Sequence, residues 1–344
     1  MPIPHVEGTS NDIDKIVDYF FHWLRFSLLY VIRPRRRYSR TGHGRLFDVF
    51  RRVSAAVDRR RGSFGEKIRT RAEPIYAGRI RPQQLLASGE VPFVMASGTG
   101  ALTSHILGVK DQVIIMTTMN QVNSALFSRT DIKSAAELRG KTIATGRPGA
   151  FGDMMVRYVL RAKLGLVPDR DVKLLAIGEA QLAFPALERG IVQAASLTIP
   201  FTLIAKKMGY RELIDYDKAG VVYPYNTVTT LRQTPAKNPE LPEKFLKTMI
   251  EGIHLAKTDK EKSLAVLKKY MKGTPDDILE ETYQYAKSAA EDVPTPSVEI
   301  TKTALEILSY QYPQAKETDP NSIIDASIMK RIEQSGFIKT LYKK

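Results

Sequence analysis

From about residue 73 onward, short apolar runs alternate with segments of helical periodicity, and this alternation restricts the fold more than any other feature. Strands that alternate with helices are typical of α/β proteins, in which helices cover mainly parallel sheets. The pattern predicts strands at residues 72–76, 92–97, 112–119, 124–129, 141–146, 172–178, 192–197 and 211–216. It predicts helices at residues 81–90, 100–108, 150–164, 180–190 and 201–209.

After an extended segment at residues 223–234, the rest of the sequence is nearly all helical. A chain of 344 residues is long enough for two domains of ordinary size. We therefore expect an α/β protein of two lobes, each a mainly parallel sheet flanked by helices, with a helical C-terminal region.

Two of the predicted strand-to-helix connections are glycine-rich turns. Residues 97–100 read SGTG, and residues 146–153 read GRPGAFGD before a helix with regularly spaced apolar residues. In a parallel sheet such turns lie at the carboxyl ends of the strands, where helix N-termini present unpaired N–H groups to ligands. Ser97, Thr99 and Asp153 add side chains that form hydrogen bonds. The two turns are therefore predicted to face one ligand-binding cleft.

Ordinary turn chemistry is the alternative interpretation of both glycine turns. Neither ends in the Gly-Lys-Ser/Thr of a phosphate-binding loop, and neither has the full G-x-G-x-x-G dinucleotide fingerprint. Asp153 and Arg157 also stand four residues apart, which is the spacing of an ion pair on a helix surface.

Residues suited to catalysis or metal binding are sparse. The chain has no cysteine, which excludes disulfides, thiolate metal sites and a cysteine nucleophile. The five histidines lack metal-ligand spacing, and neither a G-x-S-x-G nor an H-E-x-x-H motif is present. The acidic cluster at residues 276–281 opens a predicted helix, where acids favour the helix dipole. We predict no catalytic residue, no metal site and no cofactor.

The net charge of +15 is concentrated near the N-terminus. Residues 1–72 contain sixteen Lys and Arg against seven Asp and Glu, a net of +9. No DNA-binding motif or aromatic platform accompanies these basic runs, so nucleic acid is not an expected partner. Residues 16–32 are apolar, but Asp18, His22 and Arg25 interrupt them and the basic cluster follows them, unlike a secretory signal. We interpret residues 1–61 as an atypical basic segment, either amphipathic or disordered.

Three stretches of the sequence carry a family resemblance. They are IRPQQLLASGEVPFVMASGTGAL, the long run from DIKSAAELRGKTIATG to IVQAASLTIP, and KKMGYRELIDY with the later FLKTMIEGIHLAKTDKEKSLAVLKKY. These motifs are collinear over about residues 73–344. They resemble the nitrate/sulfonate/taurine-type substrate-binding proteins of ABC transporters, in the superfamily of the thiamine-pyrimidine synthases.

The resemblance implies a two-lobed periplasmic-binding-protein fold that closes on its ligand about hinges near two crossings. Lobe one would comprise residues 62–125 and 220–344, and lobe two residues 126–219. The family's ligand-binding positions fall at Ser97, Gly98, Thr99, Gly149, Ala150, Phe151, Asp153, Thr198, Pro200, Tyr223 and Tyr225.

The function implied by the resemblance is that of a solute-binding component of an ABC importer. It would capture a small anionic or polar solute between the lobes and deliver it to permease subunits, in the periplasm or another extracytoplasmic location. Membrane association would occur only through the permease or the N-terminal segment. The alternative is an enzyme of the same fold, similar to thiamine-pyrimidine synthases or aromatic-sulfinate hydrolases, whose cysteine or histidine chemistry this sequence does not visibly supply.

The N-terminal part departs from the family pattern. No clear signal peptide is present, and the first strand and helix of the family are not recognisable before residue 62. Arginine-rich sequence without periodicity is what a shifted reading frame in GC-rich DNA would give. We therefore expect residues 1–61 to be out of frame or rearranged, which would leave lobe one without one of its elements.

Overall fold

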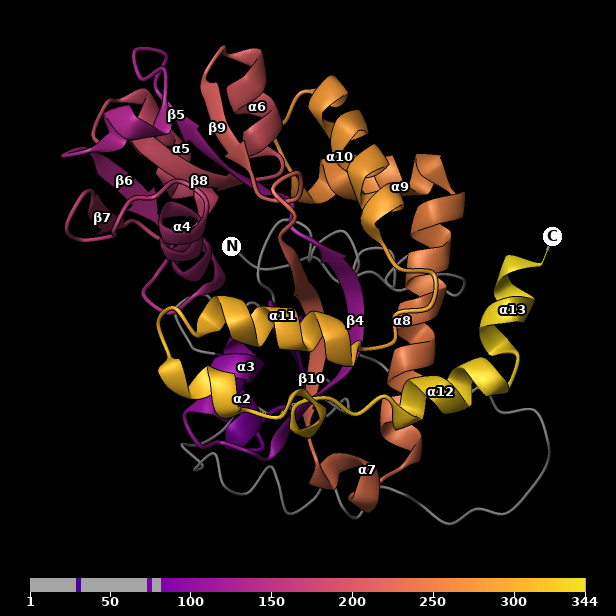
Figure 1. The fold of residues 1–344 in the computed structure, drawn as a ribbon. Helices are drawn as coiled ribbons and strands as arrows, with labels where there is room; N and C mark the ends of the chain where they lie inside the picture. Colours follow the sequence, from indigo (N-terminus) through magenta and orange to yellow (C-terminus); the bar gives the residue numbers. More distant parts are fainter. Residues whose placement is uncertain (1–28, 32–72, 76–81, 344) are drawn as a thin grey trace, which may run out of the picture.

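The computed structural model describes residues 29–31, 73–75 and 82–343 of the chain. The expectations for residues 1–61 lie outside the described residues, apart from 29–31. Two short strands, β1 (Leu29–Val31) and β2 (Glu73–Ile75), pair antiparallel. The rest of the described chain forms two larger sheets with helices packed on them, and Figure 1 shows the second sheet to the upper left of the first. The α/β fold class is therefore confirmed.

The first sheet has the strand order β3–β10–β4. Its strands are β3 (Phe93–Ala96), β10 (Val222–Leu231) and β4 (Gln112–Gln121). β10 is antiparallel to both neighbours, with Thr227 opposite Ala96 on one side and Thr117 on the other. The described pairs of this sheet are thus antiparallel rather than parallel as expected, because the returning strand β10 inserts between β3 and β4.

Helices cover both faces of the first sheet. Val113 and Ile115 of β4 face a core that contains apolar residues from five helices, whereas Ile114 between them faces the opposite side. These helices are α8 (Glu240–Thr258), α9 (Lys260–Tyr270), α10 (Asp276–Ala289), α12 (Ser327–Gln334) and α13 (Phe337–Tyr342). The opposite side is covered by α3 (Thr99–Ile106) and α11 (Val298–Leu308).

The second sheet has the strand order β7–β6–β8–β5–β9. Its strands are β5 (Ser124–Ser128), β6 (Thr142–Thr145), β7 (Lys173–Ala176), β8 (Ala194–Thr198) and β9 (Arg211–Asp215). β6 is parallel to β7 and β8, whereas β5 is antiparallel to β8 and β9. One face packs on α5 (Ala180–Glu188) and α6 (Phe201–Lys207), and the other on α4 (Phe151–Ala162).

The chain crosses between the two sheets twice. The first crossing is at residues 122–123, between β4 and β5, and the second is at residues 216–221, between β9 and β10. Tyr216 in the second crossing is fully buried, and its hydroxyl donates a hydrogen bond of 3.0 Å to Ser196 Oγ. We retain the division into two lobes, with one larger sheet in each, and the lobe boundaries as a proposal.

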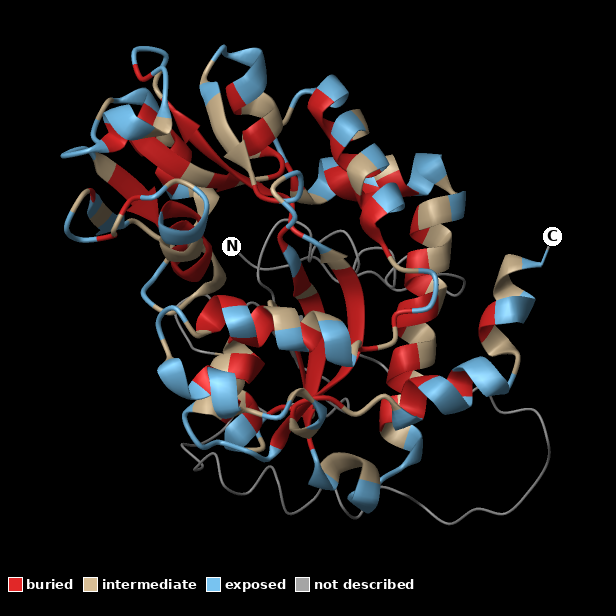
Figure 2. Ribbon diagram, in the orientation of Figure 1, coloured by how far each residue is buried: buried red, intermediate tan, exposed pale blue. Residues whose placement is uncertain are grey.

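Six shorter elements complete the described chain. They are α2 (Pro82–Ala87), the 3-10 helix η3 (Ala135–Leu138), α7 (Gln233–Lys237), the 3-10 helices η4 (Pro313–Glu317) and η5 (Pro320–Ser322), and α13 (Phe337–Tyr342). Figure 2 shows buried residues along the strands of both sheets, apart from the edge strands β7 and β9, and exposed residues on the outer faces of the helices. Among the described residues, no helix has both the length and the apolar character needed to cross a bilayer.

Candidate functional site

Three parallel strands of the second sheet end along one edge, and a helix begins after each of them. β6, β7 and β8 are followed by α4, α5 and α6, whose N-cap residues are Ala150, Glu179 and Pro200. In open α/β sheets, ligands bind outside the carboxyl ends of parallel strands. This edge also lies beside the first crossing between the sheets, because Thr198 at the end of β8 is paired with Ser124.

The SGTG turn of the first lobe is tied to β10. Gly98 N–H donates to the Pro224 carbonyl at 3.0 Å, and a Cβ at Gly98 would lie only 2.6 Å from that oxygen. Thr99 Oγ1 is 3.0 Å from both the Tyr223 hydroxyl and Ser97 Oγ. Glycine is therefore required at position 98 for close backbone approach, and the two hydroxyl side chains form a short polar chain that ends on β10.

Aromatic rings connect this turn to the glycine turn of the second lobe. The Phe151 ring packs edge-on against Tyr223 and Tyr225, with centroids 5.5 and 4.8 Å apart. Burial raises the pKa of the Tyr223 phenol, an effect opposed by its hydrogen bond with Thr99. The structure thus brings the residues predicted on the two turns together around Tyr223, as the sequence suggested.

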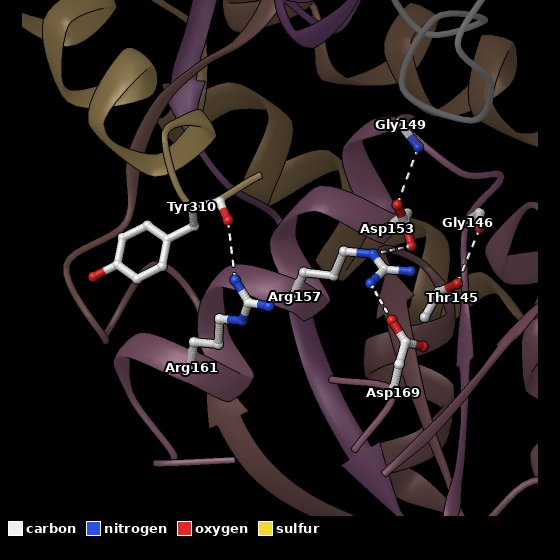
Figure 3. Close-up of polar contacts among 8 residues, drawn as sticks. All are labelled: Thr145, Gly146, Gly149, Asp153, Arg157, Arg161, Asp169 and Tyr310. Carbon is white, nitrogen blue, oxygen red and sulfur yellow. Dashed lines mark hydrogen bonds and ion pairs between the residues drawn. The ribbon is translucent and has the colours of Figure 1, made fainter. Parts of the chain in front are cut away.

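The second glycine turn is held by hydrogen bonds within its own lobe (Figure 3). Asp153 is 1% exposed; its Oδ2 accepts from Gly149 N–H at 3.0 Å and its Oδ1 from Arg157 Nε at 3.0 Å. Arg157 also donates to Asp169 Oδ2 at 2.7 Å. Gly149 has φ +75°, which favours glycine, and the Ala150 carbonyl accepts from Asp153 N–H at 3.1 Å. Asp153 therefore shapes this turn, and both carboxylate oxygens are already bonded.

Unpartnered polar atoms lie beside Tyr225, where the chain first crosses between the sheets. Asn123 and Ser124 are 7% and 3% exposed, yet Asn123 Oδ1 and Ser124 Oγ have no hydrogen-bond partner among the described residues. The buried hydroxyl of Tyr285 on α10 also lacks a hydrogen-bond partner among the described residues. Burial raises the pKa of Tyr225, and hydrogen bonding with Ser124 and Asn123 opposes this rise, although its geometry is too long or bent to satisfy either side chain. Buried polar groups without a partner are rare and indicate a site that a ligand or water completes.

Sequence reasoning missed Asn123, Ser124 and Tyr285. The sequence does contain a signal for a polar site here: an Asn-Ser pair stands between two strongly apolar strands, and such a pair is unusual in a buried connection. Ser124 lies directly opposite Thr198 of β8, so the two side chains share a face of the sheet. Thr198 is one of the predicted ligand-binding residues. It lies next to Ser124 and also lines a pocket.

A pocket of about 250 Å³ lies between the second lobe and the turn that connects α9 to α10. The second lobe contributes Thr198, Pro200 and the N-terminal residues of α5 and α6, and Lys272 and Thr274 face them from the α9–α10 turn. The charge of Glu179, which also lines the pocket, contributes to the raised pKa of Tyr225. The pocket therefore extends along the same sheet edge as the aromatic group.

Of the predicted site residues, only Thr198 and Pro200 line this pocket. The other nine are Ser97, Gly98, Thr99, Gly149, Ala150, Phe151, Asp153, Tyr223 and Tyr225, and they belong to the two glycine turns and the aromatic group between them. Ser97 and Tyr225 are partly exposed, whereas Thr99 and Tyr223 are buried. β6, which precedes the second glycine turn, lies between β7 and β8, and the residues that follow β7 and β8 line the pocket.

The acidic residues that open α10 are bound by lysines. Asp276 pairs with Lys268 at 2.9 Å and Glu280 with Lys260 at 2.7 Å, while Lys207 contacts both Asp277 and Glu281. Asp276 and Asp277 lie in the first turn of α10, where the structural interpretation of this cluster placed them. Within the described part of the chain, no group of three or more His, Asp or Glu side chains is arranged to hold a metal ion.

Several solved structures share this fold. A Bordetella bronchiseptica RB50 protein is 19% identical with a TM-score of 0.65, covering 76% of this chain and 86% of that one. The alkanesulfonate-binding protein SsuA from Xanthomonas axonopodis pv. citri, bound to MOPS, is 20% identical with a TM-score of 0.58, covering 70% and 83%. The desulfurization enzyme DszB, in a variant complexed with biphenyl-2-sulfinic acid, is 13% identical with a TM-score of 0.56, covering 74% and 89%.

Identities this low establish the fold alone, which binding proteins and an enzyme share. None of the curated proteins compared with the chain matches it. The model of the NMT1-like family matches residues 87–268, which is more than half of the chain and includes the second sheet and both glycine turns. The chain is therefore a member of the NMT1-like family.

Proposed function

We propose that the protein is the solute-binding component of an ABC importer, which captures a small anionic or polar solute between its lobes. The observation that carries the proposal is the pocket of about 250 Å³ between the second-lobe helices and the α9–α10 turn. The helices that border this pocket belong to different buried clusters, α5 and α6 to that of the second sheet and α9 and α10 to that of the first, so a ligand bound there can stabilise one arrangement of the lobes over another.

The composition of the pocket supports an anionic group on the solute. The first residues of α5 and the N-cap residue of α10, Pro275, border it, and helix N-termini favour negative charge. Lys272 lines it and makes no ion pair with the described residues. Glu179 is the opposing charge, and it is 3.4 Å from Arg147, which moderates its effect. The SsuA relatives bind sulfonates, and a sulfonate or carboxylate suits the same features.

Binding rather than catalysis is favoured by what lines the pocket. Glu179 and Lys272 are its ionisable residues, and neither histidine nor cysteine is among the lining residues. The proposal extends to delivery of the solute to permease subunits and to a periplasmic or other extracytoplasmic location, which agrees with the periplasmic SsuA proteins of the same fold.

A thermal-shift screen tests the proposed function. Sulfonates, carboxylates, nitrate and neutral polar solutes are added in turn to the full chain, and unfolding is followed by fluorescence. A solute at 100 times its dissociation constant stabilises the native state by about 2.7 kcal/mol. For a hit, Lys272→Gln is expected to weaken binding, whereas Lys330→Gln, on the distant α12, is expected to leave it unchanged. Absence of a shift for every solute class would contradict the proposal.

A further inference from the structure

Besides the two crossings and the aromatic group, helices of the second lobe pack on helices of the first at two flanks, which differ in chemistry. On one flank α4 packs against α11, and on the other α6 lies beside α10 (Figure 1). α6 packs in the core of the second sheet, whereas α10 packs in the core of the first. The contacts on these flanks therefore determine how the two cores can move apart.

The α4–α11 flank has a buried apolar interior, and beside it lies a pocket of about 210 Å³ lined in part by Arg157, Arg161 and Gln311. Met154, Val156 and Val159 of α4 share one buried cluster with Leu305 and Leu308 of α11. Arg161 adds a hydrogen bond of 3.0 Å to the Tyr310 carbonyl beyond α11, and the Tyr158 and Tyr310 rings pack edge-on with centroids 5.4 Å apart. Separating these helices would expose apolar side chains to water, which is unfavourable.

Among the described residues, the ion pairs between α6 and α10 share one exposed cation. Lys207 Nζ lies 2.6 Å from Asp277 Oδ2 and 2.9 Å from Glu281 Oε1. The side chains are 42%, 64% and 47% exposed, respectively, so water can replace these contacts at little cost. Both helices also border the solute pocket, α6 through Ile204 and α10 through its N-cap residue Pro275.

We propose that the lobes separate asymmetrically: the α4–α11 flank acts as the pivot, and Lys207 with Asp277 and Glu281 acts as an electrostatic latch on the opening side. Lys207 bridges two carboxylates spaced one helical turn apart, so its removal leaves both acids without this cation. Because the latch joins the helices that flank the pocket, releasing it opens the pocket directly. The inference concerns the lobe equilibrium of the free protein and holds whichever solute is bound.

The same helix provides a matched control. Lys206 is 45% exposed and pairs with Glu212 of β9 at 2.6 Å, which keeps its ion pair inside the second lobe. Lys206→Gln and Lys207→Gln remove the same charge from adjacent positions. Only the second change removes a contact between the lobes.

Pulsed electron paramagnetic resonance on spin-labelled protein tests the latch. The chain has no native cysteine, so label pairs can be introduced cleanly. Met208→Cys with Lys287→Cys reports the α6–α10 flank, and Lys163→Cys with Lys302→Cys reports the α4–α11 flank. All four positions are exposed.

In the ligand-free protein at low salt, Lys207→Gln is expected to raise the population of the longer α6–α10 distance about two- to five-fold. The α4–α11 distance should stay unchanged, and Lys206→Gln should match the unsubstituted chain. Salt near 1 M, at which the Debye length falls to about 3 Å, should reproduce the effect of Lys207→Gln. Reversing both partners, with Lys207→Glu, Asp277→Lys and Glu281→Lys, should restore the short distance.

Three outcomes would overturn the latch. An unchanged α6–α10 distance distribution in Lys207→Gln would show that the ion pairs do not bias the lobes. Equal shifts in Lys206→Gln and Lys207→Gln would assign the effect to net charge. Lengthening of both label pairs together would exclude a pivot at α4–α11.

Discussion

Replacing Ser124 by alanine is expected to stabilise the ligand-free protein, which is the opposite of the usual effect of a buried substitution. Ser124 is 3% exposed, and its Oγ has no hydrogen-bond partner among the described residues. An unsatisfied buried polar group costs about 1–3 kcal/mol, and removing the hydroxyl removes that cost. Alanine favours a strand less than serine does, and this difference offsets the gain by a few tenths of a kcal/mol. A net gain of about 1 kcal/mol follows.

Ser263 is the matched control for this prediction. It is also fully buried, but its Oγ donates to the carbonyls of Asp259 at 2.7 Å and Ala256 at 3.2 Å. Ser263→Ala is therefore expected to lower the free energy of unfolding by about 0.5–1.5 kcal/mol. The two serine substitutions should differ in sign.

Urea denaturation of the ligand-free chain measures both effects. Ser124→Ala should raise the midpoint with an unchanged m-value, and Ser263→Ala should lower it. If Ser124 Oγ instead shares a hydrogen bond with the nearby Tyr225 hydroxyl, Ser124→Ala will lower the midpoint. That result would refute the argument that these polar atoms await a ligand.

Three further predictions concern structural positions. Asp153→Ala should lower the free energy of unfolding by about 1.5–3 kcal/mol in denaturant titrations, since it removes charge-assisted hydrogen bonds; a loss below about 0.5 kcal/mol would contradict its role in shaping the turn. Gly98→Ala should reduce soluble yield and melting temperature, because its Cβ would lie 2.6 Å from the Pro224 carbonyl oxygen, and a native melting temperature would refute this. Burial lowers the pKa of His105, with Lys110 and Arg232 adding to the effect, so the unfolded chain binds the proton more tightly. The free energy of unfolding should therefore fall as pH drops below about 6.5, and His105→Gln should flatten this dependence.

Much of the fold could be predicted from local pattern. The strand expected at residues 141–146 is β6 at Thr142–Thr145, and the helix expected after it is α4. Both signals lie within a short window of sequence, where apolar periodicity and glycine turns suffice. The antiparallel position of β10 could not be predicted in the same way, because strand order depends on contacts between distant segments.

The site was only partly predictable for the same reason. The glycine turns were recognisable, and Thr99 and Phe151 do meet on Tyr223. Asp153 looked like a ligand-binding side chain, but whether Gly149 and Arg157 occupy its oxygens depends on the three-dimensional shape of the turn. The α9–α10 turn has no sequence signal for binding, and only the packing of α10 brings Lys272 opposite Thr198.

Hydrogen–deuterium exchange with and without a solute from the thermal-shift screen tests the central claim most directly. If the pocket between the lobes is the binding site, protection should be concentrated at residues 179–181, 198–204 and 271–275, which border it from both lobes. Protection confined to the pocket between α4 and α11, or to one lobe alone, would contradict the account.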